Sequence, residues 1–323
     1  MPVEARTIGH FERILYLRKV PAIGTLPAAD LGLLAEYARE RFFPKGAVLF
    51  REGEPVGSVQ YLIEGSVHVS RRGRLIGHAG TGSVVGGIGM LARDGEGLEA
   101  VAEADTHTLE VGAGALFDLF EDHFRILLHV SREVCRQIID MHRRAAHGVT
   151  LPVPALHPPV RLAAGELDLV ERIFFLRQTP VFGRSSINAL AELSRGMAEV
   201  RFEPGVTLWH EGDPAGWLVL LVEGTVSGRL STGRHLPLGP GTPPGALETL
   251  GDVPRWYTAT TETPVLALHG GADGVLDVFE DNFEMATDYL AVMARWLLDG
   301  LEVMAAPNEA ELQRLYGCAE EPA

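Results

Sequence analysis

Apolar residues recur at helical spacing at both ends of each half of the chain. Phe11 and Ile14 start one such stripe, and Leu31 and Leu34 belong to a second stripe that follows a proline, so two short helices are predicted. A longer stripe runs from Leu116 to Met141, with a counterpart from Val275 to Leu298. Each of these longer stripes predicts one long helix.

Between the helical stretches, the pattern changes to short apolar runs that are separated by glycines and acidic residues. Such runs are typical of strands joined by tight turns. The predicted strands are Leu49-Phe50, Val59 to Ile63, Val67 to Val69, Leu75-Ile76, Leu208-Trp209, Trp217 to Val222 and Thr225-Val226. A series of many short strands favours a closed antiparallel roll or barrel.

The chain repeats itself at an offset of 159 residues. When residues 12–67 are paired without gaps with residues 171–226, 21 of the 56 positions are identical. The shared landmarks include Glu12-Arg13-Ile14 with Glu171-Arg172-Ile173, Glu52-Gly53 with Glu211-Gly212, Glu64-Gly65 with Glu223-Gly224, and Phe120-Glu121-Asp122 with Phe279-Glu280-Asp281. A period of this length indicates two whole domains rather than a solenoid.

These patterns define the expected domain organisation. We expect a first domain over residues 1–144, a Pro-rich linker over 145–166, a second domain over 167–302 and an acidic C-terminal tail over 303–323. The linker contains four prolines, which interrupt any helix and indicate a semi-rigid spacer. The fold class is mainly β with flanking helices (α+β), arranged as two jelly-roll-like β-rolls in tandem.

Composition narrows the classes of function. The chain has 28 Lys and Arg against 43 Asp and Glu, and the net charge of -15 disfavours nucleic acid as a partner. Its two cysteines, Cys135 and Cys318, provide neither a disulfide framework nor a Cys-rich zinc site and suit a reducing cytoplasm. No apolar run approaches the roughly 18 residues that a membrane helix needs. We therefore expect a cytoplasmic protein without a membrane partner.

Catalytic and metal-binding patterns do not emerge from the sequence. The 12 histidines, among them His123, His129 and His142, lack a strong metal spacing, so a solvent-facing helical position is expected for them. The chain contains no nucleophile elbow, P-loop or HExxH string. We expect no catalytic residues, no metal and no cofactor, and hence a protein that is not an enzyme.

One segment carries a family resemblance. The run from Gly46 to Pro55, followed by Tyr61 to Val67, resembles the start of a cyclic-nucleotide-binding domain, and the second copy repeats it from Gly205 to Pro214 and from Leu221 to Val226. The glycines of these turns are expected to adopt positive φ. The resemblance covers about residues 12–143 and 171–300. It implies jelly-roll-like β-rolls with helices at both ends, and tandem pairs of this kind resemble the regulatory subunits of cyclic-AMP-dependent kinases.

The resemblance also implies where a ligand would bind. In that family the cyclic phosphate is held by a cassette similar to Phe-Gly-Glu-Leu-Ala-Leu, followed after several residues by Arg-Ser/Thr-Ala-Ser/Thr. The glycine lets backbone N–H groups approach the phosphate, the arginine neutralises its charge, and the glutamate accepts a hydrogen bond from the ribose.

The first copy departs from this cassette. Its glycine is Gly86, but Gly87 stands in place of the glutamate, and Glu96 falls near the expected arginine. The only cation close by in the sequence is Arg93. Because an acidic residue repels a phosphate, we expect this first site to be degenerate.

The second copy is closer to the family pattern. Gly245 is followed by Ala246 in place of the glutamate and by Glu248 two positions later, and Arg255 precedes a Thr-Ala-Thr strand that begins at Thr258. The candidate ligand residues are therefore Gly245, Glu248, Arg255 and Thr258. Two interpretations of Arg255 remain open: a ligand for an anion, or a surface or interface arginine that stacks on an aromatic neighbour.

Two hypotheses of function follow from these observations. The first is a non-catalytic regulatory or scaffolding protein that acts through contacts with an unidentified protein, with its ligand sites largely lost. The alternative is a sensor of a cyclic nucleotide, or of a related anion, at a modified site in the second domain. The apolar stripes of the two long helices also lead us to expect a homodimer.

Overall fold

The computed structural model describes residues 8–94, 97–145, 151 and 166–305, and these residues form two compact units. Unit 1 contains the described residues up to Val130, together with Leu151 and residues from Leu297 onward. Unit 2 contains the described residues from Ser131 to 145 and from 166 to Trp296. The final helix of each sequence copy is therefore divided between the two units.

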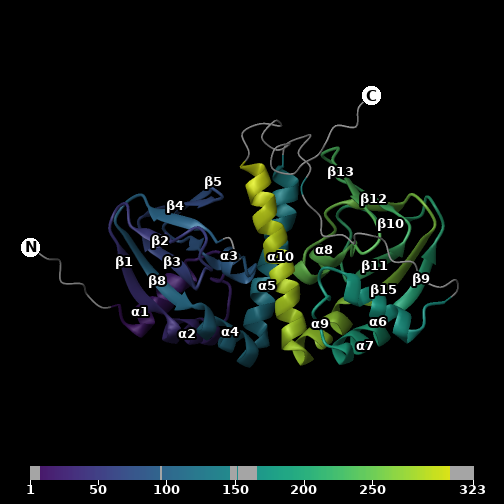
Figure 1. Ribbon diagram of the computed structural model, residues 1–323, viewed down its shortest axis with the longest axis horizontal. Helices are drawn as coiled ribbons and strands as arrows, with labels where there is room; N and C mark the ends of the chain where they lie inside the picture. Colours follow the sequence, from purple (N-terminus) through teal and green to yellow (C-terminus); the bar gives the residue numbers. More distant parts are fainter. Residues whose placement is uncertain (1–7, 95–96, 146–150, 152–165, 306–323) are drawn as a thin grey trace, which may run out of the picture. The chain divides into compact units, whose positions relative to one another are not determined.

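Unit 1 is built from short helices around two β-sheets (Figure 1). Its helices are α1 (His10–Arg18), α2 (Ala28–Tyr37), α3 (Gly87–Leu91), α4 (Ala113–Asp122) and the beginning of α5 (Phe124–Arg144). Its strands are β1 (Arg39–Phe43), β2 (Val48–Phe50), β3 (Ser58–Glu64), β4 (Ser66–Arg71), β5 (Arg74–Gly80), β6 (Val84–Val85), β7 (Glu99–Ala102) and β8 (Thr106–Gly112). The sheets have the strand orders β1-β8-β3-β6 and β2-β7-β4-β5. All of the described strand pairs are antiparallel.

Unit 2 repeats this plan. Its helices are α6 (Leu169–Gln178), α7 (Ile187–Arg195), α8 (Ala246–Gly251), α9 (Ala272–Asp281) and most of α10 (Phe283–Met304). Its strands are β9 (Ala198–Phe202), β10 (Thr207–Trp209), β11 (Trp217–Glu223), β12 (Val226–Arg229), β13 (His235–Leu238), β14 (Thr258–Thr261) and β15 (Val265–Gly271). The sheets have the orders β11-β15-β9 and β10-β14-β12-β13, and α6, α7 and α9 gather at one end of the strands (Figure 1). The expected α+β class with two tandem β-rolls is confirmed.

The identical residues near the start of each copy hold the first helix in place. In unit 2, the Asp168 side chain accepts a hydrogen bond from the N–H of Glu171, and the Glu171 carboxylate accepts one from the N–H of Asp168. This reciprocal capping satisfies two N–H groups that a helix start leaves without partners. The neighbouring Arg172 donates to the carbonyl of Met197 at 2.9 Å, as Arg13 does to the carbonyl of Ala38 at 2.8 Å in unit 1.

A second pair of identical residues fixes a β-turn in each unit. The Glu52 carboxylate accepts a hydrogen bond from the N–H of Gly73, between β4 and β5, at 3.2 Å. Its counterpart Glu211 accepts hydrogen bonds from the N–H and the hydroxyl of Ser231, between β12 and β13. A carboxylate that accepts from the backbone makes a charge-assisted hydrogen bond. The repeated glutamates therefore stabilise the same turn twice.

The turn glycines named from the sequence have the expected backbone. Gly46, Gly53 and Gly65 have φ values of 84°, 83° and 95°. At Gly224, the counterpart of Gly65, φ is 85°, and a Cβ atom would overlap the carbonyl oxygen of Pro264. Glycine is therefore required here both by conformation and by the close approach of the neighbouring backbone.

The prediction of one long helix at the end of each copy is wrong in detail. His123 leaves the helical conformation with φ -136° and separates α4 from α5, and Asn282 does the same with φ -130° between α9 and α10. The His123 N–H closes α4 on the carbonyl of Leu119. An apolar stripe continues across each break, which is why periodicity alone did not reveal it.

Apolar side chains of the last helices are covered within the chain. Ile126 and Leu127 of α5 are 1% exposed, and Leu290 and Leu298 of α10 are also 1% exposed. None of the helices among the described residues combines the length and apolar character that a membrane crossing needs.

Substituting Gly224 should reveal the close approach of the backbone. Gly205 has a similar φ of 84°, but no atom lies within 4 Å of the position that a Cβ would take there, so Gly205→Ala should cost only about 1–2 kcal/mol of strain. Gly224→Ala should cost at least about 2 kcal/mol more, because the Pro264 region must also move. Urea unfolding followed by tryptophan fluorescence measures both, and equal losses would contradict the close approach.

Candidate functional site

The cassette of unit 2 begins at Gly245, which caps the start of α8 with φ 89°. Its N–H donates to the hydroxyl oxygen of Tyr257 at 3.2 Å. The next N–H, of Ala246, donates to the carbonyl of Pro243 at 3.1 Å. Two of the backbone donors at this helix start are therefore already engaged within the unit.

Arg255 is buried beside this turn, with 1% of its surface exposed. Its Nη1 donates to Glu248 Oε1 and to the carbonyl of Gly245, each at 3.3 Å, and its Nη2 donates to the carbonyl of Trp217 at 2.6 Å. The guanidinium also lies 4.0 Å from the ring centre of Trp209. The predicted aromatic stacking is confirmed, whereas the surface position predicted for it is wrong, because carboxylate, carbonyls and rings together replace water around the cation.

Glu248 is the charge partner of Arg255. Its side chain is 1% exposed, and its second oxygen accepts a hydrogen bond from Nε1 of Trp256 at 3.1 Å. Burial raises the pKa of Glu248, and the charge and hydrogen bond of Arg255 offset only part of this effect. Arg255 and Glu248 thus form a buried ion pair that water does not reach.

Thr258 makes a different contact from the other candidate residues. As the first residue of β14, it accepts a hydrogen bond from the N–H of Glu211 at 3.0 Å through its hydroxyl. Three of the four candidate residues of the second copy, Gly245, Glu248 and Arg255, come together in the structure. Thr258 instead fixes β14 to the turn that carries Glu211.

A cavity of about 50 Å³ lies beside α8 in unit 2. It is bounded by β13, by the loop that leads into α8, and by parts of α5 and α10. The side chains that form its walls include Leu236, Leu238, Leu247, Trp256, Met293 and Trp296. Its surface is predominantly apolar, because many of its wall residues come from outside the cassette.

His142 of α5 forms part of this cavity wall and is 1% exposed. Its ring contacts both Trp256 and Trp296, whose ring centres are 5.2 and 5.6 Å away. Neither ring nitrogen has a hydrogen-bond partner among the described residues. Burial, helped by the charge of Arg234, lowers the pKa of His142 to about 3, so the imidazole is neutral at pH 7. The solvent-facing position predicted for it is therefore wrong.

The cassette of unit 1 has a similar backbone but different surroundings. Gly86 caps α3 with φ 87°, and Gly87 is the first residue of that helix. The predicted acidic replacement, Glu96, lies outside the described residues. Arg93, named as the nearby cation in the sequence, is exposed and has φ 50°.

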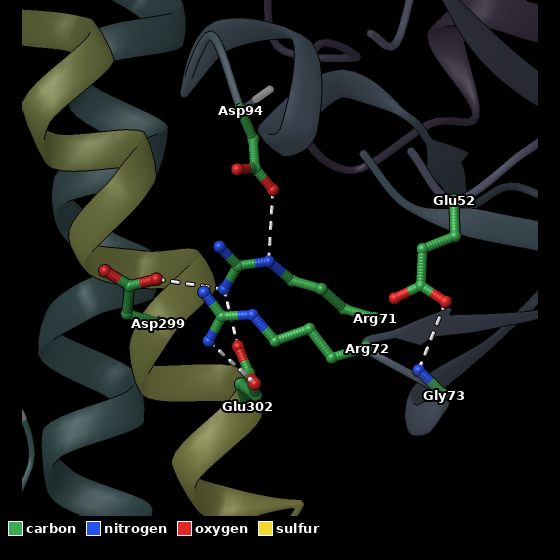
Figure 2. Close-up of polar contacts among 7 residues, drawn as sticks. All are labelled: Glu52, Arg71, Arg72, Gly73, Asp94, Asp299 and Glu302. Carbon is green, nitrogen blue, oxygen red and sulfur yellow. Dashed lines mark hydrogen bonds and ion pairs between the residues drawn. The ribbon is translucent and has the colours of Figure 1, made fainter. Parts of the chain in front are cut away.

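The buried cation of unit 1 is Arg71, at the end of β4, with 1% of its surface exposed (Figure 2). Its Nε donates to Asp94 at 3.0 Å, and its Nη1 donates to Asp299 at 2.9 Å and to Glu302 at 2.6 Å. Arg72 also donates to Glu302, at 3.3 Å. We call these residues, Arg71, Arg72, Asp94, Asp299 and Glu302, the unit 1 charge cluster.

The charge cluster contains more acidic than basic groups. Burial alone lowers the pKa of Arg71, but the hydrogen bond to Asp299 and the charges of Asp94 and Glu302 outweigh burial and raise it. Arg71 therefore stays charged and is held by three carboxylates. Figure 2 shows its guanidinium directed toward α10, away from the turn that Glu52 holds.

Sequence reasoning did not identify Arg71, Asp94, Asp299, Glu302 or His142 as site residues. The arginines of the β4–β5 turn have the pattern of an exposed turn, and their acidic partners on α10 lie more than 200 positions away. These charges come together because the end of β4 and the end of α10 lie close to each other in the folded unit 1. No group of three potential metal ligands occurs among the residues that the structure describes.

Removal of one member of the buried pair in unit 2 should destabilise the fold strongly. Arg255→Met leaves the Glu248 carboxylate buried without its partner, at an expected cost of about 3–5 kcal/mol. Arg255→Met combined with Glu248→Leu should recover at least half of that loss, because no buried charge remains. All four tryptophans lie in unit 2, so fluorescence-monitored urea unfolding measures this unit. Additive losses in the double variant would contradict the pairing.

The neutral state of His142 should make unit 2 acid-sensitive. The unfolded chain binds a proton at His142 near pH 6.5, whereas the folded unit binds it only near pH 3. Stability should therefore fall as pH falls below about 6.5, by up to about 1.4 kcal/mol per pH unit. His142→Phe should lose about 2 kcal/mol less than the wild type between pH 7.5 and 5.0 in the same unfolding measurement. If the wild type and His142→Phe lost the same stability over this pH range, His142 would not be buried as a neutral imidazole.

Comparison with known proteins supports the repeat. The model of the cyclic nucleotide-binding domain matches residues 40–123 and again residues 199–282. Among curated proteins, the chain is 29% identical over 131 residues to the CRP-like cAMP-activated global transcriptional regulator of Mycobacterium tuberculosis, covering 38% of this chain and 57% of that protein. It is 26% identical over 141 residues to the CRP-like protein Clp of Xanthomonas campestris, covering 40% of this chain and 61% of that protein. The chain thus spans about three fifths of the length of these relatives.

Solved structures give similar matches. The regulatory domain of Toxoplasma gondii PKA with cAMP is 13% identical, with 88% of this chain and 96% of that chain covered and a TM-score of 0.35. The N-terminal domain of a transcriptional regulator from Streptomyces coelicolor is 33% identical, with 42% of this chain and 97% of that chain covered and a TM-score of 0.35. Since the family model matches both copies and more than half of the chain, this protein belongs to the cyclic nucleotide-binding domain family.

Proposed function

We propose that this chain is a non-catalytic regulatory protein in which neither domain holds a cyclic nucleotide in the family's manner. The observation that carries the proposal is the closed pair of Arg255 and Glu248 in unit 2. A cyclic phosphate needs a cation to neutralise it, and here the cation at the cassette already has a buried carboxylate as its partner.

The cost of exchanging partners supports this proposal. For Arg255 to bind a phosphate, it would have to leave Glu248 and the carbonyl of Trp217 while the carboxylate stayed buried. Removing the partner from a buried charge costs about 3–5 kcal/mol, which a ligand would have to offset before it bound. The N–H groups of Gly245 and Ala246 would have to give up their acceptors as well.

Unit 1 presents the same obstacle in another form. Its buried cation, Arg71, is held by Asp94, Asp299 and Glu302. An added phosphate would enter a region in which the carboxylates already outnumber the buried cation, and like charges repel at short range. The unit 1 charge cluster thus favours an internal structural role over nucleotide binding.

Contacts with a protein partner agree with the surface of the first helices. Phe11 and Leu15 of α1 are 70% and 47% exposed, and their counterparts in the second copy, Val170 and Phe174 of α6, are 59% and 63% exposed. Exposed apolar groups that gather on one face are typical of protein interaction sites. The same positions are exposed in both copies, so each unit offers a similar surface to a partner.

The expected homodimer stays a prediction. It was motivated by apolar stripes on the long helices, and the structure covers Ile138, Leu127, Leu290 and Leu298 within the chain. The exposed residues of α1 and α6 provide an alternative contact surface for a second protein.

The alternative function is a sensor of a cyclic nucleotide, since the Mycobacterium tuberculosis relative is named as cAMP-activated. Thermal unfolding with cyclic AMP, cyclic GMP and cyclic di-GMP separates the two functions. Saturating a site at 100 times its dissociation constant would stabilise the fold by about 2.7 kcal/mol. We expect no shift of the melting temperature with any of them, and the Mycobacterium tuberculosis relative serves as a positive control. A shift that Arg255→Lys removes would overturn the proposal in favour of the sensor.

A further inference from the structure

The cavity of unit 2 contains a polar group that its surroundings do not satisfy. His142 is 1% exposed and forms part of the wall, yet neither of its nitrogens has a partner among the described residues. The buried Nε1 of Trp296, in the same wall, also lacks one there. Buried polar groups are nearly always hydrogen-bonded, because leaving one unsatisfied costs the solvation that it had in water. This cavity therefore has the chemistry of a binding site for a hydrogen-bonding molecule.

The other polar side chains of the wall are already paired. Glu248 bonds Arg255 and Trp256, the hydroxyl of Tyr257 accepts from Gly245, and the hydroxyl of Tyr289 lies 3.4 Å from the sulfur of Cys135. The hydroxyl of Thr242 donates to the carbonyl of Gly239 at 2.6 Å. Among the described residues of this wall, His142 and Trp296 are consequently the groups left to recognise a ligand.

The rest of the wall determines the shape and polarity of a ligand. Leu236, Leu238 and Met293 present aliphatic surface, and Trp256 and Trp296, which both contact His142, present aromatic surface. Aromatic rings pack well in such surroundings, edge to face or offset. The cavity volume of about 50 Å³ exceeds the roughly 30 Å³ that one water molecule takes up in the liquid, so the cavity admits a group larger than a single water molecule.

The charges around the cavity argue against an ionic ligand. Glu248 contributes the carboxylate of the wall, and its cation Arg255 is occupied by it. His142 contributes no positive charge at pH 7, since burial lowers its pKa to about 3. A neutral imidazole offers one hydrogen-bond donor and one acceptor. An uncharged ligand that carries a hydroxyl or N–H group can satisfy it without bringing an unpaired charge into the cavity.

We infer that the cavity of unit 2 binds a small uncharged aromatic molecule whose hydroxyl or N–H group hydrogen-bonds to His142. This inference goes beyond the proposed function, because it names a ligand class for a protein that does not bind cyclic nucleotides there. A ligand ring beside His142 that contacts Trp256 and Trp296 would connect α5 and α10 within unit 2, and so would link ligand binding to the packing of these two helices.

The test uses the intact chain and four probes of similar ring size. Phenol carries a donor and an acceptor, anisole only an acceptor, benzene neither, and benzoate a charge. Titration followed by tryptophan fluorescence and by calorimetry should show phenol binding about tenfold more tightly than benzene, with anisole between them. Benzoate should bind at least tenfold more weakly than phenol.

Matched variants assign the hydrogen bond to His142. His142→Phe keeps a ring in contact with the two tryptophans but removes both nitrogens, so the preference for phenol over benzene should disappear. His269→Phe makes the same change in unit 2, next to Trp217 and outside the cavity wall, and should leave both affinities unchanged. Nitrogen chemical shifts of the histidine rings in the wild type give an independent measurement: one imidazole should shift with phenol and stay unshifted with benzene.

Each result supports or overturns the inference. Binding of phenol with the stated preference, lost in His142→Phe, would support it. Equal affinities for phenol and benzene in the wild type, a stronger affinity for benzoate, or no binding of any probe would overturn it. Failure of the proposed function looks different, since binding of a cyclic nucleotide would appear in the thermal measurement and depend on Arg255, with or without binding of phenol.

Discussion

A guanidinium that is removed from water must be neutralised inside the protein, and this constraint organises both units. Arg255 and Arg71 are each 1% exposed, and each is held by carboxylates of its own unit. In unit 2 the pairing fixes the turn into α8, since the same arginine donates to the carbonyls of Gly245 and Trp217. In unit 1 it ties β4 to the end of α10. Both buried guanidinium groups therefore stabilise contacts within their own unit.

The two units share a scaffold whose repeated residues have structural roles. Glu12 and Glu171 cap the first helix, Arg13 and Arg172 bind the backbone at the start of the first strand, and Glu52 and Glu211 each hold a turn. Each of these side chains satisfies backbone groups that would otherwise lack partners. This explains why the sequence repeat is strongest in the first third of each copy and weaker around α3 and α8, where the two units differ in charge.

The predictability of the structure differs between scaffold and site for a physical reason. Strands, turns and early helices follow from local periodicity and from glycines with positive φ, so they could be predicted from the sequence. The separation of α4 from α5 could not, because the apolar stripe does not change at His123. The site depended on contacts between distant segments: Arg255 was recognised as a candidate, but its burial against Trp209 was not. His142 has the sequence surroundings of a solvent-facing helical residue. Its side chain is buried because residues from distant parts of unit 2, among them Trp256 and Trp296, pack against it.

The glutamates that hold the turns lie outside the cassettes, and this has an evolutionary consequence. After the ancestral domain was duplicated, mutations around α3 or α8 could accumulate without loosening the turns at Gly73 and Ser231. The contacts that hold the turns and the residues of the cassettes can therefore vary independently of each other. The two copies accordingly share the same turns, while one contains a charge cluster and the other an apolar cavity.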